Sequence, residues 1–269
     1  MTDKYCVIGN PIAHSKSPEI HPVYAARTGQ DLVYERCLAP LDGFEATVRR
    51  LVEEGYRGAN VTLPFKLEAA RVATRLTARG QAAGAVNTLV FQDGEIIGDN
   101  TDGLGLVADI VRNAGVAIAG KRVLLLGAGG AVRGALLPIL QERPREIVIA
   151  NRTVATAEGL ARDFSRYGIG LEATGFDKIK GSFDIVLNGT SSSLAGELPP
   201  IPGSVFAQGA LALDMMYGNK PTVFMEFAAR HGAVTRDGLG MLVEQAAEAF
   251  AIWRGVRPDT AEVFKKLRP

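Results

Sequence analysis

Short apolar runs alternate with amphipathic segments along the first hundred residues of the chain. Apolar runs bounded by glycine, proline or asparagine predict strands, and apolar positions three and four residues apart predict helices. We expect strands at 4–8, 32–38, 58–61, 88–91 and 95–97, and helices at 18–27, 44–52 and 67–76. Asp93-Gly94 favours a hairpin turn between the last two strands. The pattern predicts an α/β domain with a mostly parallel sheet and an antiparallel edge.

A second alternation of strands and helices follows a helix that we expect over 102–113. Strands are expected at 122–126, 146–150, 169–173, 183–187 and 210–214, and helices at 239–254 and 261–267. We place the domain boundary near residue 102. Two α/β domains in tandem predict a cleft between them, which is a common place for a binding site.

A glycine turn stands at the start of the second domain. The apolar run 123–126 ends in Gly127-Ala-Gly-Gly130, and a helical pattern follows. A strand, a glycine turn and a helix in this order place free backbone N–H groups at a helix N-terminus, which favours a phosphate. Glycine suits the turn because a Cβ would block a pyrophosphate. Val132 stands where the third glycine of the dinucleotide motif would be, so the helix should pack slightly further from the sheet.

The next expected strand, 146–150, ends in Asn151-Arg152-Thr153. NAD-binding domains usually carry Asp or Glu at this point, where it binds the ribose 2′-hydroxyl. A carboxylate would repel a 2′-phosphate, whereas Arg152 would attract it and its two neighbours can donate hydrogen bonds. A surface arginine at a strand end is common in α/β proteins, but the glycine turn upstream favours a binding role. We therefore expect NADP(H) rather than NAD(H).

Composition limits the class of protein. The chain has 269 residues, 47% hydrophobic and 22% charged, which supports a sizeable core without disorder. A formal net charge of +1 argues against nucleic acid or a membrane surface as the main partner. No apolar run is long enough to span a bilayer, and we expect no signal segment. Cys6 and Cys37 suggest free thiols in a reducing cytoplasm, and no cysteine or histidine cluster has metal-ligand spacing, so no metal is expected.

Polar residues gather in places of the first domain where the fold does not require them. Ser15 and Ser17 precede a helix and could hold a carboxylate or hydroxyls, or Ser17 could be only the helix N-cap. Asn60, Thr62 and Lys66 follow the strand 58–61. A helix N-terminus disfavours a nearby cation, which suits Lys66 to proton transfer unless it is solvated at the surface.

A third polar group contains Asn87, which begins a strand, and Asp102, which could cap the helix 102–113. Lys66 and Asp102 could also act as a proton-transfer pair if the fold brings them together. The three histidines fall in a loop, on a helix face and at a helix end, and no pattern supports a catalytic role for them. They are His14, His21 and His231.

The ordered motifs of the chain resemble those of the shikimate dehydrogenase family along nearly the whole length. The matching segments are Ser15-Lys-Ser17, Asn60-Val-Thr-Leu-Pro-Phe-Lys66, Gly84-Ala-Val-Asn-Thr88, Asp99-Asn-Thr-Asp-Gly103, Gly127-Ala-Gly-Gly-Ala131, Asn151-Arg-Thr153, Asn188-Gly-Thr-Ser191, Asp214-Met-Met-Tyr217 and Gly238-Leu-Gly-Met-Leu-Val-Glu-Gln245. The resemblance implies NADPH-dependent, reversible reduction of 3-dehydroshikimate to shikimate, a step of chorismate and aromatic amino acid biosynthesis. It also implies a small-molecule substrate, no nucleic-acid or membrane partner, and a monomer or homodimer.

The resemblance further implies a role for each matching residue. Lys66 would be the catalytic acid/base, and Asp102 would hold and polarise it. The implied substrate-binding residues are Ser15, Ser17, Asn60, Thr62, Asn87, Tyr217 and Gln245. The implied cofactor-binding residues are Gly127, Ala128, Gly129, Gly130, Ala131, Asn151, Arg152, Thr153, Thr190, Met215, Gly238 and Met241.

Gln245 lies on the long C-terminal helix, so this helix should fold back onto the first domain. We therefore predict a substrate-binding and catalytic domain over 1–102, completed by the C-terminal helices 239–269, and a Rossmann NADP-binding domain over 103–238.

Three alternatives remain at this point. A quinate or dual-specificity quinate/shikimate dehydrogenase would share the same motifs. A methylene-tetrahydrofolate type of dehydrogenase would need an aromatic-lined pocket for its pterin, which the short polar side chains do not supply. A non-catalytic NADP(H) sensor could use the same fold, but it would not need both Lys66 and Asp102.

Overall fold

The computed structural model describes residues 2–168 and 170–268. Met1 and Pro269, at the ends of the predicted first domain, and Ile169, which begins a predicted strand, lie outside the described residues. The chain divides into two compact units, one formed by residues up to 105 together with 242 onward, the other by 106–241. In the sequence, the divisions fall inside helices α5 (Asp102–Ala108) and α9 (Leu239–Arg254). The predicted boundaries, 102 and 238, lie three residues before these divisions.

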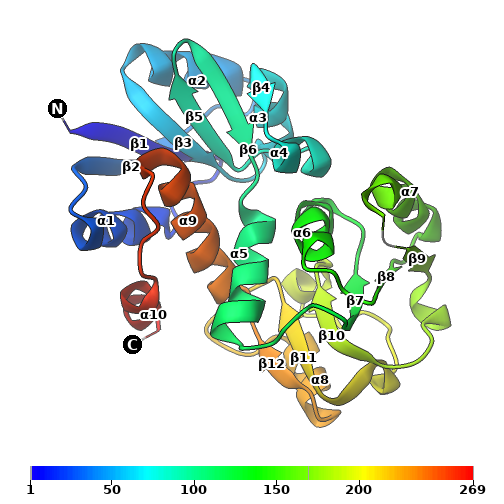
Figure 1. The fold of residues 1–269 in the computed structure, drawn as a ribbon. Coiled ribbons are helices and arrows are strands. Elements are labelled where there is room, and N and C mark those ends of the chain that lie inside the picture. Colours follow the sequence, from blue (N-terminus) through cyan, green and yellow to red (C-terminus); the bar gives the residue numbers. More distant parts are fainter. Residues whose placement is uncertain (1, 169, 269) are drawn as a thin grey trace. The chain divides into compact units, whose positions relative to one another are not determined.

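The first unit is built on a six-stranded sheet with the strand order β2-β1-β3-β5-β6-β4 (Figure 1). Its strands are β1 (Asp3–Gly9), β2 (Leu32–Leu38), β3 (Tyr56–Val61), β4 (Arg75–Leu76), β5 (Thr88–Gln92) and β6 (Glu95–Asp99). Its further helices are α1 (Ser17–Thr28), α2 (Phe44–Glu53), α3 (Lys66–Val72), α4 (Ala78–Ala83) and α10 (Ala261–Leu267). A mostly parallel sheet was expected from the alternation of strands and helices, and the structure has one.

The antiparallel strand is not at the edge of this sheet, so that prediction is wrong. β5 runs antiparallel between β3 and β6, and the edge strand is β4, which pairs in parallel with β6. The helix predicted over 67–76 is also too long, because it ends at Val72. Thr74 N–H donates to the Ile96 carbonyl at 2.8 Å, so pairing with β6 replaces the helical pattern there. The Thr77 hydroxyl then caps α4, a helix that the sequence pattern did not reveal.

Helix α9 packs on the sheet of the first unit although it lies far away in sequence. The Trp253 indole N–H donates to the Leu89 carbonyl at 3.0 Å, and the Tyr24 hydroxyl donates to the Val243 carbonyl at 2.9 Å. Gly58 allows this approach, because a Cβ there would lie 2.5 Å from the indole nitrogen. The C-terminal helix thereby places Gln245 in the first unit.

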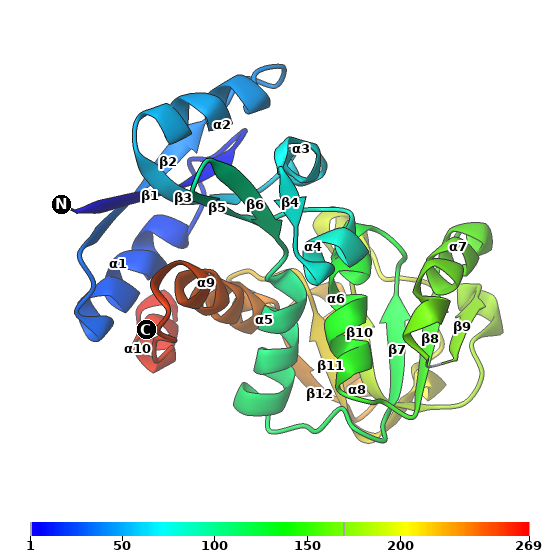
Figure 2. The ribbon, with the colours of Figure 1, turned by 45° about the horizontal axis from the view of Figure 1, so that its top comes forward.

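The second unit holds six parallel strands in the order β12-β11-β10-β7-β8-β9, which lie side by side in Figure 2. They are β7 (Arg122–Leu126), β8 (Glu146–Ala150), β9 (Leu171–Thr174), β10 (Phe183–Asn188), β11 (Phe206–Asp214) and β12 (Val234–Arg236). The helices are α6 (Gly130–Gln141), α7 (Val154–Phe164) and α8 (Val223–Arg230), with a π-helical turn over Asp109–Asn113 and 3₁₀ turns at Ser165–Tyr167, Phe176–Lys178, Ser192–Ala195 and Gly203–Val205. Chain order reverses between β7 and β10, and ligands of such sheets bind beyond the carboxyl ends of the strands at this point.

No helix in the described part of the chain combines the length and the apolar character needed to cross a membrane.

A half-buried ion pair, Arg79–Asp99, anchors the end of β6. The Asp99 carboxylate is 4% exposed and accepts hydrogen bonds from Arg79 Nη2 at 2.5 Å, Thr77 Oγ1 at 2.6 Å and the Asn100 N–H at 2.7 Å. Replacing Arg79 would leave this buried charge short of its main partner, which is costly.

We expect Arg79→Ala to lower the free energy of unfolding by about 3 kcal/mol in urea titrations. Arg75→Ala is the matched control, because the Arg75–Glu95 pair is at 3.4 Å and both side chains are at least half exposed. Exposed pairs of this kind contribute about 0.5 kcal/mol. Equal losses in the two variants would show that the burial of Asp99 does not matter.

Candidate active site

Lys66 and Asp102 form an ion pair in the first unit, with Lys66 Nζ 2.6 Å from Asp102 Oδ2. Lys66 is the first residue of α3, and Asp102 is the first residue of α5. Their side chains are 29% and 17% exposed, so the pair is partly buried but open to a ligand and to solvent. The carboxylate at a helix N-terminus is favoured by the helix dipole, and it offsets the unfavourable placement of the ammonium group. The structure therefore brings together the two residues whose pairing the sequence left open.

Asn87 holds the carboxylate from its other side. Its Nδ2 donates to Asp102 Oδ1 at 2.8 Å and also lies 3.0 Å from Thr101 Oγ1 and 3.3 Å from Gln245 Oε1. Its Oδ1 accepts from the Thr101 N–H at 2.8 Å and from Thr88 Oγ1 at 2.9 Å. These contacts fix the orientation of the amide. Asp102 is thus held between a cation and a neutral donor, which is the arrangement expected of a group that orients a catalytic lysine.

Three further predicted residues surround this network. Gln245 is 9% exposed, and its Nε2 donates to the Leu242 carbonyl at 2.9 Å. Asn60 is 5% exposed and contacts the Asn87 carbonyl through Nδ2 at 3.2 Å. Thr62 follows β3 in a turn, where its N–H donates to the Ile8 carbonyl at 2.9 Å. Short neutral side chains of this kind suit a polyhydroxylated ligand.

Ser15 and Ser17 lie where the loop after β1 enters α1. Ser17 is buried and is the first residue of the helix, whereas Lys16 occupies the cap position and no side chain caps the helix. The interpretation of Ser17 as a simple N-cap is therefore wrong. Arg36 Nη2 donates to the Ser15 carbonyl at 2.8 Å, a contact that sequence reasoning missed. Tyr217, the remaining predicted substrate residue, belongs to the second unit, where it follows β11 and is 42% exposed.

The glycine turn joins β7 to α6 in the second unit, as its sequence predicted. Gly127 has a φ of +99°, which favours glycine, and its N–H donates to the Ala150 carbonyl at 2.8 Å. A Cβ on Gly129 or Gly130 would meet no atom within 4 Å, so both glycines face open space at the helix N-terminus. Ala128 and Ala131 complete the turn. Backbone N–H groups at such an open helix N-terminus fit a pyrophosphate.

Val132 packs where the dinucleotide motif has its third glycine. The residue is fully buried, and a Cβ on Gly189 would lie 2.6 Å from Val132 Cγ2. Gly189, just after β10, therefore provides the space that the valine requires.

The other predicted cofactor residues lie at the carboxyl ends of neighbouring strands of this sheet. Strand β8 is followed by Asn151, Arg152 and Thr153, of which the last two are exposed. Asn151 Nδ2 donates to the Thr153 carbonyl at 2.9 Å. Thr190 follows β10 and donates through Oγ1 to Asn188 Oδ1 at 2.7 Å. Met215 follows β11, Gly238 follows β12, and Met241 lies in the first turn of α9. All of these predicted residues except Met241 therefore lie at one end of a single sheet.

Asp214 supports this end of the sheet, and sequence reasoning gave it no role. Its buried carboxylate accepts from Ser193 Oγ and Thr222 Oγ1, both at 2.6 Å, and from the Met216 N–H at 3.0 Å. The carboxylate thereby ties three loops together. Asn188 Nδ2 also donates to it at 3.2 Å, and since these partners lie up to 26 residues away, no local pattern could have revealed them.

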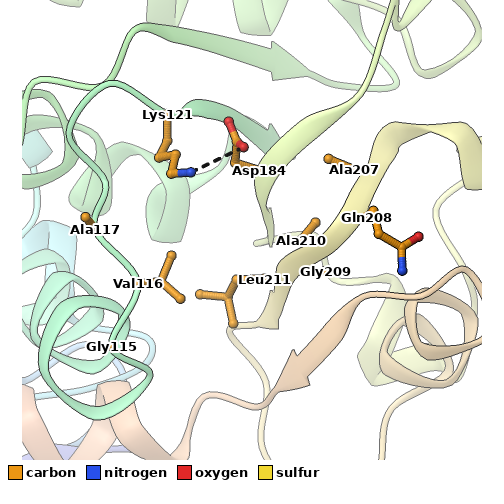
Figure 3. A pocket seen from close by; sticks show the side chains of 10 residues that line it. All are labelled: Gly115, Val116, Ala117, Lys121, Asp184, Ala207, Gln208, Gly209, Ala210 and Leu211. Atoms are coloured by element: carbon orange, nitrogen blue, oxygen red, sulfur yellow. Dashed lines mark ion pairs between the residues drawn. The ribbon is translucent and has the colours of Figure 1, made fainter.

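A surface pocket of about 330 Å³ lies at the opposite end of the same sheet, toward the amino ends of the strands (Figure 3). Its lining includes Val116, Leu211, Gln208 and several small residues, together with Lys121 and Asp184, which lie 3.6 Å apart. It contains none of the predicted site residues. The pocket is therefore separate from the glycine turn.

The second unit has the sheet and glycine turn of a dinucleotide-binding domain, and the first has a lysine–aspartate pair among neutral polar side chains. These two features define a nicotinamide-dependent dehydrogenase of the two-domain α/β class. Comparisons with known proteins narrow the class. Family models match three segments: "Shikimate dehydrogenase substrate binding domain" over residues 7–89, "Shikimate / quinate 5-dehydrogenase" over 109–195 and "Shikimate 5'-dehydrogenase C-terminal domain" over 238–268. The chain belongs to the shikimate dehydrogenase family.

Individual relatives agree with this assignment. A protein of Janthinobacterium sp. (strain Marseille) named shikimate dehydrogenase (NADP(+)) is 63% identical, with 99% of this chain and 97% of that protein covered. A crystal structure of an Ael1 enzyme from Pseudomonas putida has a TM-score of 0.94 at 50% identity and covers 99% of this chain and 98% of that one. Shikimate 5-dehydrogenase from Thermus thermophilus, solved with NADP(H) and shikimate, has a TM-score of 0.87 at 28% identity and 99% coverage of both chains.

Proposed function

We propose that this protein catalyses the reversible, NADPH-dependent reduction of 3-dehydroshikimate to shikimate in aromatic amino acid biosynthesis. The observation that carries the proposal is the Lys66–Asp102 pair, fixed by Asn87 among short neutral side chains. The names of the relatives support the same reaction and the same cofactor.

Lys66 is the proton donor of this reaction. Reduction of a ketone requires a hydride at carbon, which bound NADPH supplies, and a proton at oxygen. Lys66 Nζ transfers its proton to the carbonyl oxygen while Asp102 holds the ammonium group in line. The partial exposure of Lys66 allows it to regain a proton from solvent, and the same steps run backward for shikimate oxidation.

The substrate is a cyclic acid with several hydroxyl groups, and the first unit offers matching groups. Ser15 and Ser17 bind the carboxylate as hydroxyl donors. Thr62 and Gln245 bind ring hydroxyls, Asn87 orients the Lys66–Asp102 pair, and Tyr217 is a further substrate-binding residue.

NADP(H) binds at the carboxyl end of the second sheet. Gly127 to Ala131 hold the pyrophosphate, because this turn presents backbone N–H groups in open space. Asn151, Arg152 and Thr153 hold the 2′-phosphate. Thr190, Met215, Gly238 and Met241 flank the ribose and the nicotinamide. We further propose that the enzyme is cytoplasmic, because Cys6 and Cys37 are free thiols, as is usual in a reducing compartment. We also propose that it acts as a monomer or homodimer.

The direct test measures NADPH or NADH formation with shikimate or quinate, each with NADP⁺ or NAD⁺. We expect turnover with shikimate and NADP⁺. Comparable turnover with quinate would indicate a dual-specificity enzyme. Cofactor binding without turnover of any pair would contradict the proposal and favour a sensor.

A further inference from the structure

The buried side chain of Asn60 has no hydrogen-bonding capacity left for a ligand. Its Oδ1 accepts from the Tyr34 hydroxyl at 2.6 Å and lies 3.2 Å from His21 Nε2. Its Nδ2 contacts the Asn87 carbonyl and Thr88 Oγ1, both at 3.2 Å. A primary amide has two N–H donors and two acceptor sites, so these four contacts use all of them. A substrate could bind Asn60 only by breaking one.

Tyr34 holds the oxygen of this amide from strand β2. The residue lies buried on β2, with its ring stacked on His21 at 4.1 Å between centroids. Its hydroxyl donates to Asn60 Oδ1 at 2.6 Å. Burial lowers the pKa of His21 to about 3, so its ring stays neutral and can donate through Nε2 to Asn60.

Asn60 in turn reaches the proton relay through Asn87. Asn60 Nδ2 donates to the Asn87 carbonyl. Thr88 Oγ1, which also accepts from Asn60, donates to Asn87 Oδ1 at 2.9 Å. Asn87 Nδ2 then holds Asp102, which holds Lys66. A continuous series of side-chain hydrogen bonds therefore runs from Tyr34 to the lysine.

We propose that Asn60 and Tyr34 are positioning residues that fix Asn87 and the Lys66–Asp102 pair, and that Asn60 does not bind substrate. The inference rests on the proposed function, since it concerns the same reaction. It replaces the substrate-binding role that the resemblance implies for Asn60. Misplacement of a catalytic group by about 1 Å costs up to about 100-fold in rate, so loosening this series should lower kcat.

The chain offers a matched pair of variants to test this. Tyr34→Phe and Tyr5→Phe each remove one hydroxyl from the same apolar cluster, at positions that face each other in the β1–β2 register. The Tyr5 hydroxyl contacts Arg254 Nη1 at 3.4 Å and has no link to Asn60. We expect Tyr34→Phe to lower kcat about tenfold and to change the pH profile of kcat, and Tyr5→Phe to change neither. Urea midpoints of both variants separate this effect from a loss of stability.

Asn60→Asp gives a second test, because it keeps the acceptor oxygen but loses both N–H donors to Asn87 and Thr88. We expect a loss in kcat larger than that of Tyr34→Phe, with the KM for shikimate changed less than about threefold. An unchanged kcat in Tyr34→Phe, or a raised KM with unchanged kcat in Asn60→Asp, would overturn the inference. Wild-type protein inactive with shikimate would instead contradict the proposed function.

Discussion

Replacement of Lys66 by methionine should lower kcat roughly 10²- to 10⁴-fold in both directions of the reaction, the scale of a lost general acid–base group. Methionine keeps an apolar stem like that of lysine but lacks the ammonium group, whose proton the carbonyl oxygen receives. It also leaves Asp102 Oδ2 without the ammonium group that lies 2.6 Å away. Binding of NADP⁺ should be unchanged, because the expected cofactor residues all belong to the second unit. Steady-state rates and a fluorescence titration with NADP⁺ measure the two effects.

Lys4→Met is the matched control, since Lys4 is an exposed lysine on β1 of the same unit. It makes the same change of charge and should keep wild-type kcat. If Lys66→Met retained kcat within about tenfold of wild type, Lys66 would not be the proton donor, and the proposed mechanism would be wrong.

Strongly periodic segments could be predicted well from the sequence. The helices expected at 239–254 and 261–267 have these same bounds in the structure, because each shows a continuous apolar face. The predicted helix 67–76 was wrong over 73–76, where long-range pairing with β6 decides the structure, and the helix at 78–83 was not predicted. Residues 75–76 form a strand only because Ile97 and Gly98 lie beside them, and no local pattern contains that information.

The parts of the candidate site differ in how far sequence could reveal them. Lys66 and Asp102 were suggested by unusual placement at helix starts and by the resemblance, and the structure places them in contact. Tyr34 and His21 could not be found in this way. An aromatic residue in a strand and a histidine on a helix face have the pattern of ordinary core residues. Only the fold shows that both side chains meet at one oxygen of Asn60.

Replacement of Arg152 should change cofactor preference more than any other single change in the second unit. Arg152 is exposed at the carboxyl end of β8, where the adenosine 2′-phosphate is expected to lie. A charge-assisted hydrogen bond contributes about 1.5–3 kcal/mol, so Arg152→Ala should raise the KM for NADP⁺ roughly 10- to 100-fold. The KM for NAD⁺ should be unchanged, because NAD⁺ has no phosphate at this position. Initial rates with each cofactor at saturating shikimate measure both values.

Arg166→Ala provides the control for the loss of one positive charge. Arg166 lies beyond the C-terminal end of α7, with its guanidinium 5.0 Å from the Tyr167 ring, whereas Arg152 precedes the N-terminus of that helix. A general electrostatic attraction between the protein and NADP⁺ would weaken similarly in both variants and would fall with salt. A specific contact with the 2′-phosphate predicts a large change only in Arg152→Ala. Equal increases of the KM for NADP⁺ and NAD⁺ in Arg152→Ala would show that this arginine shapes the adenosine site without recognising the phosphate.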